Sequence, residues 1–169
     1  TIIQSQNVIN CSGLWGHIIA NKLLKDKYEI EYYKGDYFKT NQLRNMNCLI
    51  YPIPKKISLG IHAILNLNGE IIFGPNAYKV NNIDYSTSDK YKNIFLEEAN
   101  KLVTKKINKL NKDYSGIRPK IKFDGKINDF IIKEEPSIEN FYNLIGIDSP
   151  GLTSSLAIAK FICSLIDKS

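Results

Sequence analysis

The sequence has 169 residues, of which 43% are apolar, and this is enough to build one ordinary domain around a hydrophobic core. Its 10 Gly and 6 Pro exclude collagen-like and low-complexity chains, and no uncharged apolar run reaches the roughly 18 residues of a membrane-spanning helix. Three cysteines without C-x-x-C spacing indicate neither a disulfide scaffold nor a zinc site. We therefore expect no bound metal and a reducing compartment such as the cytoplasm.

The net charge of +6 permits contact with nucleic acid or with an acidic membrane. Only two basic residues are arginines, Arg44 and Arg118, whereas a specific nucleic-acid binder concentrates Arg with aromatic residues on one face. We therefore expect no nucleic-acid partner. The sequence leaves membrane association and a mitochondrial location open, and it does not indicate an oligomeric state.

The first elements are predicted by an apolar segment, a glycine turn and a helical pattern. Residues 2–10 carry the apolar pair Val8 and Ile9 just before Cys11-Ser12-Gly13, and residues 14–25 then place apolar residues at helical spacing. This order predicts a strand, a tight turn and a helix. The aromatic segment 28–40 predicts two strands that meet at a turn or bulge around Lys34-Gly35-Asp36.

The middle of the chain carries a hairpin signal and a long helical pattern. Residues 59–73 contain two apolar segments separated by Asn66-Leu67-Asn68-Gly69, and Asn-Gly is a strong hairpin signal. Between residues 87 and 110 apolar residues recur at three and four positions, with Ser86, Thr87 or Ser88 as the N-cap. This spacing predicts a long amphipathic helix.

The last part of the chain returns to the strand and helix order of the start. An Asp124-Gly125 turn separates two β-like segments, and an apolar run follows at residues 141–147. Residues 152–166 predict a helix with an unusually wide apolar face, which we expect to be buried.

These elements predict an α+β fold. Residues 1–26 and 141–169 would form part of an α/β layer, with one half of that layer missing. Residues 27–140 would form a mostly antiparallel sheet with a covering helix.

Two glycine turns that open helices are candidates for binding anionic groups. One is Asn10–Gly13 and the other is Ser149–Thr153. Free N–H groups and the helix dipole attract negative charge at such turns. Ordinary helix capping explains the same residues and is favoured by the spacing alone, so neither motif is specific by itself.

Arg118 and His62 are the candidate side chains. Arg118, between Gly116 and Pro119 in a chain that otherwise uses Lys, suggests a planar bidentate donor for a carboxylate, or else a surface residue in a turn. His62 lies in an apolar alternating segment and titrates in the range suited to accepting a hydroxyl proton. A structural histidine is the alternative.

Other catalytic arrangements are not indicated. The adjacent pairs Glu97-Glu98 and Glu134-Glu135 cannot both face one point in regular structure, which argues against a paired-carboxylate mechanism. Neither G-x-S-x-G nor H-E-x-x-H occurs in the sequence.

Several segments occur in an order that is known from one enzyme family. They are NVINCSGLWGHIIA, YYKGDYFKT, LIYPIPKKISLGIHAILNLNGEIIFGPNA, GIRPK and FYNLIGIDSPGLTSSLAIAKFI. Together they resemble the C-terminal half of FAD-dependent oxidoreductases of the D-amino-acid oxidase superfamily, and most of all the L-2-hydroxyglutarate oxidase/dehydrogenase branch. Four motifs carry the resemblance in combination: Lys34-Gly35-Asp36-Tyr37, Gly60-Ile61-His62, Gly74-Pro75-Asn76-Ala77 and Ser149-Pro150-Gly151.

The resemblance implies FAD as the cofactor, a small-molecule carboxylate as the substrate, and hydride transfer from a 2-hydroxy acid to the flavin. His62 would be the catalytic base, and Arg118 and Tyr37 would bind substrate. The cofactor-binding residues would be Cys11, Ser12, Gly13, Trp15, Ser149, Pro150, Gly151, Leu152 and Thr153.

The resemblance also assigns the two parts of the predicted fold. Residues 1–26 and 141–169 would belong to the FAD-binding domain, and residues 27–140 would form the substrate-binding domain.

Two departures from the family pattern affect these expectations. The stretch 54–59 is a few residues shorter than the usual loop, which would reshape the substrate pocket. The G-x-G-x-x-G turn that holds the FAD pyrophosphate does not occur in the 169 residues. We therefore expect an N-terminal FAD-binding half as a partner, and expect the 169 residues alone to hold FAD weakly or not at all and to be inactive.

Alternatives to 2-hydroxy-acid oxidation remain within the same resemblance. An enzyme of the same superfamily could instead oxidise glycerol 3-phosphate, or an amine or amino acid. A different class of protein is an interaction module that kept the fold and lost FAD.

Overall fold

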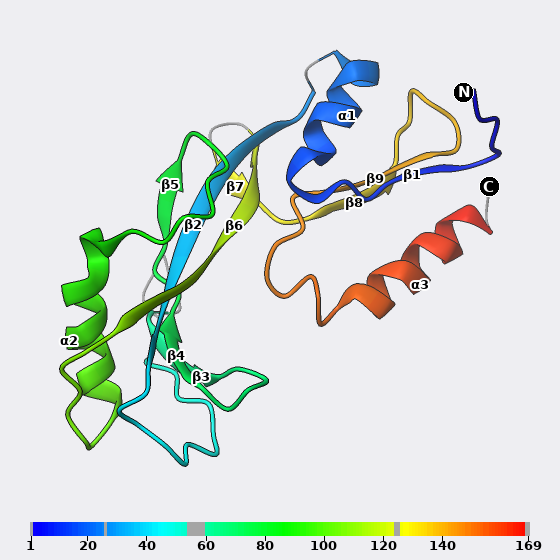
Figure 1. Cartoon of the computed structure of the whole chain (residues 1–169). Coiled ribbons are helices and arrows are strands. Elements are labelled where there is room, and N and C mark those ends of the chain that lie inside the picture. The colour runs from blue at the N-terminus through cyan, green and yellow to red at the C-terminus, as the bar shows by residue number, and fades with distance from the viewer. Residues whose placement is uncertain (1, 26, 54–59, 124–125, 168–169) are drawn as a thin grey trace. The chain divides into compact units, whose positions relative to one another are not determined.

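A computed structural model describes the chain except for residues 1, 26, 54–59, 124–125 and 168–169. Helices and strands are mixed along the sequence (Figure 1), which confirms the predicted α+β class. In chain order the elements are β1 (Val8–Asn10), the short helical turn η1 (Gly13–Trp15), α1 (Gly16–Leu24), β2 (Glu29–Thr40), β3 (His62–Leu65), β4 (Ile71–Gly74), β5 (Tyr78–Val80), the turn η2 (Asp89–Tyr91), α2 (Lys92–Leu102), β6 (Asn111–Phe123), β7 (Lys126–Asn128), β8 (Ile131–Glu134), β9 (Phe141–Ile145) and α3 (Ser155–Ile166). None of the helices within the described ranges is long and apolar enough to cross a membrane.

The chain divides into two compact units. Unit 1 consists of Thr1–Tyr32 and Arg118–Ser169, and unit 2 of Tyr33–Ile117. These boundaries differ from the sequence-based ones because β2 and β6 run without interruption from one unit into the other. A continuous strand has no break in its hydrophobic pattern to mark a boundary.

Unit 1 contains a three-stranded sheet in the order β1-β9-β8. β1 and β9 are parallel and β8 and β9 are antiparallel. Helix α1 packs on β9 and α3 packs on β8. The core of the unit is formed by Ala20, Tyr28, Ile121 and Ile145.

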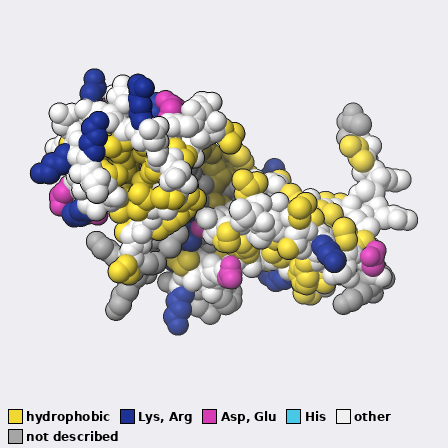
Figure 2. Space-filling model, turned by 90° about the horizontal axis from the view of Figure 1, so that it is seen from below, with side chains coloured by type: hydrophobic (Ala, Val, Ile, Leu, Met, Phe, Trp, Pro, Cys, Tyr) yellow, Lys and Arg dark blue, Asp and Glu magenta, His cyan; other side chains and the backbone are white. Residues whose placement is uncertain are grey.

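Helix α3 is less buried than its sequence suggested. Ile162 is buried, whereas Leu156 is 85% exposed and Phe161 is 48% exposed. Figure 2 shows hydrophobic side chains at the surface of the part of the molecule that contains α3. The expectation of a buried helix is therefore wrong for the described residues, because an apolar face is buried only where another element packs against it.

Strands β3, β4, β2, β6 and β7 are hydrogen-bonded in this order, and β5 pairs with β2. In unit 2 helix α2 packs on β3 and β4, as expected for a covering helix. The core of unit 2 consists of Phe38, Ile61, Ala63, Ile71, Phe73, Phe95, Ala99, Ile107 and Leu110.

The strand register assigns side chains to the two faces of this sheet. Phe73 on β4 lies opposite both Phe38 on β2 and Ala63 on β3, so these three side chains share the face covered by α2. Successive side chains of a strand point to opposite faces. Tyr37 and His62, each adjacent to a core residue, therefore point to the other face.

β2 is one strand, so the predicted pair of strands joined by a turn at Lys34-Gly35-Asp36 is wrong. A Cβ atom added at Gly35 would lie 2.6 Å from Pro75 Cβ and 2.8 Å from the backbone oxygen of Asn76. Glycine is needed here because another backbone segment crosses the strand closely, and a turn and a close approach give the same sequence signal.

The predicted Asn-Gly hairpin is confirmed between β3 and β4. Gly69 has φ +75°, and its N–H donates to the Asn66 carbonyl at 3.0 Å. The side-chain oxygen of Asn66 accepts from the N–H groups of Asn68 and Glu70 at 2.9 and 2.8 Å. The other predicted turn, Asp124-Gly125, lies outside the described residues, and the flanking strands β6 and β7 pair antiparallel.

Helix α2 ends at Leu102, well before residue 110. Ser88 Oγ accepts from the N–H of Lys90 at 3.2 Å, so Ser88, one of the three expected N-caps, caps the turn η2 that leads into α2, whereas the N-cap of α2 itself is Tyr91. In the last turn of the helix, the Asn100 side chain donates to the Ile107 carbonyl and accepts from its N–H, both at 2.9 Å. Ile107 is buried as its spacing suggested, but it reaches the core from outside the helix.

Candidate functional site

The turn after β1 is held by the last side chain of that strand. Asn10 Oδ1 accepts from the Ser12 hydroxyl at 2.6 Å and from the Ser12 N–H at 3.3 Å, and Asn10 Nδ2 donates to the Gly16 carbonyl at 2.8 Å. Gly13 has φ +57°, a conformation that favours glycine, and no atom lies within 4 Å of a Cβ built there. Cys11 and Trp15 are exposed beside it.

The second predicted turn follows β9, the parallel neighbour of β1. The hydroxyl of Thr153 donates to the Pro150 carbonyl at 2.9 Å, and the Gly151 N–H donates to the Asp148 carbonyl at 2.5 Å. A Cβ at Gly151 would contact the Ile147 side chain and lie 2.6 Å from the Asp148 oxygen, so only glycine fits. Both turns therefore lie at the carboxyl ends of adjacent parallel strands, where ligands of α/β sheets bind.

Two of the predicted cofactor residues line one pocket. Cys11 and Gly151 lie on a pocket of about 380 Å³ that is otherwise almost entirely apolar. Its lining consists of Ile9, Cys11, Leu144, Ile147, Gly151, Ser155, Ile158, Ala159, Ile162 and Cys163. Ser12, Gly13, Trp15, Leu152 and Thr153 do not line it.

Ser149 and Pro150 border a different pocket of unit 1. This pocket has a volume of about 400 Å³ and also contacts Lys120 and Asp148. Lys120 Nζ and Asp148 Oδ2 form an ion pair at 2.7 Å. The polar groups in this pocket therefore satisfy one another in part.

In unit 2, Tyr37 and His62 lie on the sheet face opposite α2. His62 is the register partner of Gly74, and a Cβ at Gly74 would lie 2.7 Å from Tyr37 Cδ1. Because Gly74 has no side chain, the Tyr37 ring has room beside β4. His62 lies on β3, the next strand of the sheet. The rings of Tyr37 and Tyr114 are stacked with centroids 4.4 Å apart, and those of His62 and Tyr51 with centroids 4.5 Å apart.

The contacts of His62 define its neutral tautomer. Nδ1 lies 3.2 Å from the Gly60 carbonyl oxygen, and His62 is 8% exposed. A carbonyl oxygen only accepts, so in the neutral imidazole this contact requires the proton on Nδ1. His62 thus meets the chemical requirement for a base.

Arg118 lies on β6 in unit 1 and is half-buried. Its guanidinium forms neither a hydrogen bond nor an ion pair with any other residue that the structure describes. Lys34, a buried cation of unit 2, differs in this respect, because its ammonium donates hydrogen bonds to Asp84 and to the Ser86 carbonyl. A half-buried arginine without such partners is suited to bind an anionic ligand.

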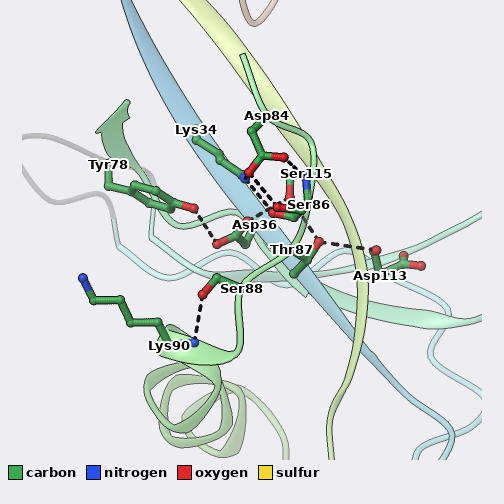
Figure 3. A network of polar contacts seen from close by, with 10 residues as sticks. All are labelled: Lys34, Asp36, Tyr78, Asp84, Ser86, Thr87, Ser88, Lys90, Asp113 and Ser115. Carbon is green, nitrogen blue, oxygen red and sulfur yellow. Dashed lines mark hydrogen bonds and ion pairs between the residues drawn. The ribbon is translucent and has the colours of Figure 1, made fainter. Parts of the chain in front are cut away.

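A buried carboxylate next to Tyr37 was missed by the sequence analysis. Asp36 is fully buried, and its two oxygens accept from the hydroxyls of Ser115 at 2.8 Å and Tyr78 at 2.9 Å (Figure 3). Ser115 Oγ also lies 3.1 Å from Thr87 Oγ1. The motif Lys34-Gly35-Asp36-Tyr37 marked this position, but it did not show that Asp36 would be a buried acceptor of hydrogen bonds.

The same network holds a buried lysine. Lys34 is 4% exposed, and its Nζ donates to the Ser86 carbonyl at 2.6 Å and to Asp84 Oδ2 at 3.3 Å. Hydrogen bonds from the Ser86 hydroxyl and N–H, together with Lys34, lower the pKa of the Asp84 carboxyl to about 2. Burial and the bond to Asp36 raise the pKa of Tyr78. The hydrogen bonds of Lys34 and Asp36 fix the part of β2 that directly precedes Tyr37.

A second buried network lies in unit 1. Glu135 is 1% exposed and accepts hydrogen bonds from the Tyr28 hydroxyl, from Lys27 Nζ at 2.7 Å and from Asn143 Nδ2 at 3.0 Å. Burial raises the pKa of its carboxyl, but the bonds from Lys27, Tyr28 and Asn143 outweigh burial and hold the pKa below its usual value. Nothing in the local sequence distinguishes Glu135 from the adjacent Glu134, which is only partly buried.

Within the described ranges, no group of three or more His, Cys, Asp and Glu residues lies close enough together to hold a metal ion. The three cysteines are free and exposed.

Comparison with known proteins identifies the family. Residues 1–165 match the family described as FAD dependent oxidoreductase. The mitochondrial L-2-hydroxyglutarate dehydrogenase of Arabidopsis thaliana is 34% identical over 93% of this chain and 37% of its own length. The glycerol 3-phosphate dehydrogenase of Caloramator mitchellensis is 28% identical over 94% of this chain and 33% of its own length. The chain thus spans about a third of the length of these relatives.

Solved structures share the fold. The L-alpha-glycerophosphate oxidase of Mycoplasma pneumoniae, determined with FAD bound, has a TM-score of 0.80 at 24% identity and is matched over 95% of this chain and 42% of its own. The L-proline dehydrogenase of P. horikoshii has a TM-score of 0.77 at 18% identity, over 98% of this chain and 44% of its own.

The family model matches the chain from its first residue to residue 165, which confirms the resemblance carried by the sequence motifs. The protein therefore belongs to the family of FAD-dependent oxidoreductases.

Proposed function

We propose that the protein takes part in the FAD-dependent oxidation of a small 2-hydroxy acid of the L-2-hydroxyglutarate type. The relative that is 34% identical over 93% of the chain has this activity in its name. The chain spans only 37% of that relative, so the proposal concerns the whole protein. The observation that carries the substrate class is the half-buried guanidinium of Arg118, which no described protein group neutralises.

The residues of unit 1 fit an FAD cofactor. Open backbone at Gly13 admits a flat group close to the turn, and Gly151 keeps the second turn tight. The apolar pocket beside Cys11 and Gly151 suits an aromatic ring system. We assign the cofactor to the two turns Cys11–Trp15 and Ser149–Thr153. When bound, FAD supplies the hydride acceptor.

Arg118 is assigned to the substrate carboxylate. A guanidinium offers two parallel N–H donors that match the two oxygens of a carboxylate, and Lys cannot reproduce this fork. The interaction orients the substrate, and orientation is a large part of what a protein contributes to such a reaction.

His62 is assigned to the substrate hydroxyl. Its Nε2 lone pair accepts the hydroxyl proton as the carbon–hydrogen bond breaks. The carbonyl of Gly60 holds the tautomer, and stacking on Tyr51 holds the ring. Tyr37, on the same sheet face, would bind the substrate and limit the access of water.

We assign FAD binding to one unit and substrate binding mainly to the other, as the resemblance implied. Unit 1 contributes to the FAD-binding domain, and unit 2 forms the main part of the substrate-binding domain. The remaining FAD-binding segments, including the pyrophosphate turn, would be supplied by an N-terminal half. An interaction module that has lost FAD would contain none of the cofactor.

The purified full-length protein tests this function. We expect a flavin absorption band, and we expect L-2-hydroxyglutarate to bleach it without oxygen. Glycerol 3-phosphate and glycine serve as the other substrates of the panel. Colourless protein that cannot be loaded with FAD would contradict the enzyme assignment, and bleaching by glycine alone would contradict the substrate class.

Glycerol 3-phosphate is the second candidate substrate. It is favoured by the matches to a glycerol 3-phosphate dehydrogenase and to a glycerophosphate oxidase structure. A phosphate carries more charge than a carboxylate and calls for additional basic donors. Bleaching by glycerol 3-phosphate in preference to L-2-hydroxyglutarate would favour this alternative.

Two variants test the residue assignments. Arg118→Lys should raise KM at least about tenfold because the bidentate fork is lost. His62→Ala should mainly lower kcat, by about 100-fold or more, because the proton acceptor is lost. Arg44→Lys, at the other arginine of the chain, is the matched control and should change neither constant. Steady-state kinetics with unchanged constants for both Arg118→Lys and His62→Ala would exclude the assignment.

A further inference from the structure

A row of buried polar side chains crosses the small sheet of unit 1 and ends at the proposed cofactor turn. Asn10 on β1 is 4% exposed, its register partner Asn143 on β9 is fully buried, and Glu135 after β8 is 1% exposed. Water does not reach polar side chains at this depth, so they must satisfy one another. Ser12 is the last member of the row and belongs to the turn itself.

The hydrogen bonds of this row all run in one direction. Asn143 Nδ2 donates to Glu135 Oε1 at 3.0 Å, and Asn10 Nδ2 donates to Asn143 Oδ1 at 2.8 Å. Ser12 then donates to Asn10 Oδ1 from its hydroxyl at 2.6 Å and from its N–H at 3.3 Å. Each donor therefore points toward Glu135.

The carboxylate explains this direction. An ionised carboxylate can only accept, whereas an amide can turn either its oxygen or its NH₂ group toward a neighbour. Glu135 requires the NH₂ group of Asn143, so the oxygen of Asn143 faces Asn10. Asn10 must then present its own NH₂ group and turn its oxygen toward Ser12. The carbonyl of Gly16, which accepts from Asn10 Nδ2, favours the same orientation.

The far end of the row has a chemical consequence at the turn. A hydroxyl has one proton to donate and two lone pairs. The proton of Ser12 is committed to Asn10, so the hydroxyl oxygen can offer only lone pairs to a ligand. With the opposite orientation of Asn10, the same hydroxyl would be free to donate.

We propose that Glu135 is a positioning residue for the flavin, acting through Asn143 and Asn10 to make Ser12 Oγ an acceptor for an O–H or N–H group of the cofactor. This inference rests on the proposed function. Glu135 does not touch the cofactor, and its effect is confined to the orientation of the groups between them.

A double-mutant cycle in the full-length protein tests the inference. Glu135→Leu removes the acceptor at nearly constant side-chain size and should weaken FAD binding about tenfold, the loss expected for one hydrogen bond. Ser12→Ala should weaken binding by a similar factor. Because both variants remove the same interaction, the double variant should bind FAD no more than about twofold worse than either single variant.

Three further variants separate positioning from simple loss of stability. Glu135→Gln keeps an acceptor oxygen and should restore most of the FAD affinity. Tyr28→Phe removes a donor to Glu135 but leaves the row intact, so it should lower the unfolding temperature without changing FAD affinity. If Glu135→Leu does not fold, Asn143→Ser interrupts the row at the next residue and should give the same tenfold loss.

The outcomes are distinct. Losses that multiply to about 100-fold in the double variant would overturn the inference, because Glu135 and Ser12 would then act independently. Equal losses for Tyr28→Phe and Glu135→Leu would also overturn it. Wild-type protein that binds no FAD would overturn the proposed function together with the cofactor role of Ser12. In that case the side-chain NH₂ resonances of Asn10 and Asn143 still test the row, which is refuted if Glu135→Leu leaves them unchanged.

Discussion

Tyr78 donates a hydrogen bond to a carboxylate that lies entirely out of contact with water. Asp36 has two such donors, Tyr78 at 2.9 Å and Ser115 at 2.8 Å. A buried charge is tolerated only when hydrogen bonds replace its hydration, and losing one donor leaves a deficit that a surface residue does not feel. The stability of the buried Asp36 carboxylate therefore depends on the hydroxyl groups of Tyr78 and Ser115.

Removal of the Tyr78 hydroxyl tests this at the residue scale. Tyr78→Phe should lower the free energy of unfolding by about 1–3 kcal/mol, because Asp36 loses a donor that water cannot replace. Tyr85→Phe, at a tyrosine that is 54% exposed, is the matched control and should change it by less than about 0.5 kcal/mol. Urea denaturation measures both. Equal effects of the two substitutions would contradict the burial argument.

At the scale of elements, two neighbouring strands each contain a glycine, but only one of these glycines is required by packing. In β2, Gly35 lies under the Pro75–Asn76 segment, and an added methyl group would meet both of those residues. In β6, Gly116 has open space at the Cβ position. The sequence presents both as a glycine inside a strand, and only the packing of a distant segment tells them apart.

Alanine substitutions distinguish the two glycines. Gly35→Ala should destabilise the protein by about 1–3 kcal/mol, because the Asn76 backbone oxygen, 2.8 Å from the new Cβ, must move. Gly116→Ala should be neutral or slightly stabilising, by up to about 1 kcal/mol, because alanine has less freedom in the unfolded chain. Thermal unfolding of the two variants is the measurement. A neutral Gly35→Ala would show that the crossing segment can move away without cost.

At the scale of the whole molecule, the stability should depend on pH through its buried carboxylates. The pKa of Glu135 is lower in the folded protein than its usual value, so the unfolded chain binds the proton more readily. This contribution to stability is complete above about pH 5 and is lost as the pH falls through the folded pKa. Asp84, with a pKa of about 2, acts in the same direction, but its exposed side chain makes the effect smaller.

Thermal unfolding at pH 7 and at pH 4 checks this dependence. The wild type should lose stability on acidification, and Glu135→Gln should lose less, because the substituted side chain no longer titrates. Glu139→Gln, at an exposed glutamate, should keep the wild-type dependence. An unchanged pH dependence in Glu135→Gln would show that other groups control acid unfolding.

Local sequence signals were sufficient for several parts of the fold. The Asn-Gly hairpin, the strand and turn at Cys11-Ser12-Gly13 and the cap at Ser88 depend on residues within a few positions of one another. The spacing of apolar residues between 87 and 110 correctly predicted that Phe95 and Ile107 are buried in the core. It predicted the end of α2 too late, because the helix ends at Leu102. Asn100, in the last turn of the helix, holds Ile107 in the loop that follows, and periodicity does not register such a contact.

The sequence by itself determined the family, because the motifs that carry it are short and contiguous, and it determined the α+β class, because strand and helix periods are local. Only the tertiary structure decided the role of Gly35, the limits of the two units, and the buried rows around Asp36 and Glu135. Glu135 meets Tyr28 across 107 residues, and Asn10 meets Asn143 across 133. Partners so far apart are chosen by strand pairing and by the need to satisfy buried polar groups, and neither requirement leaves a pattern in neighbouring residues.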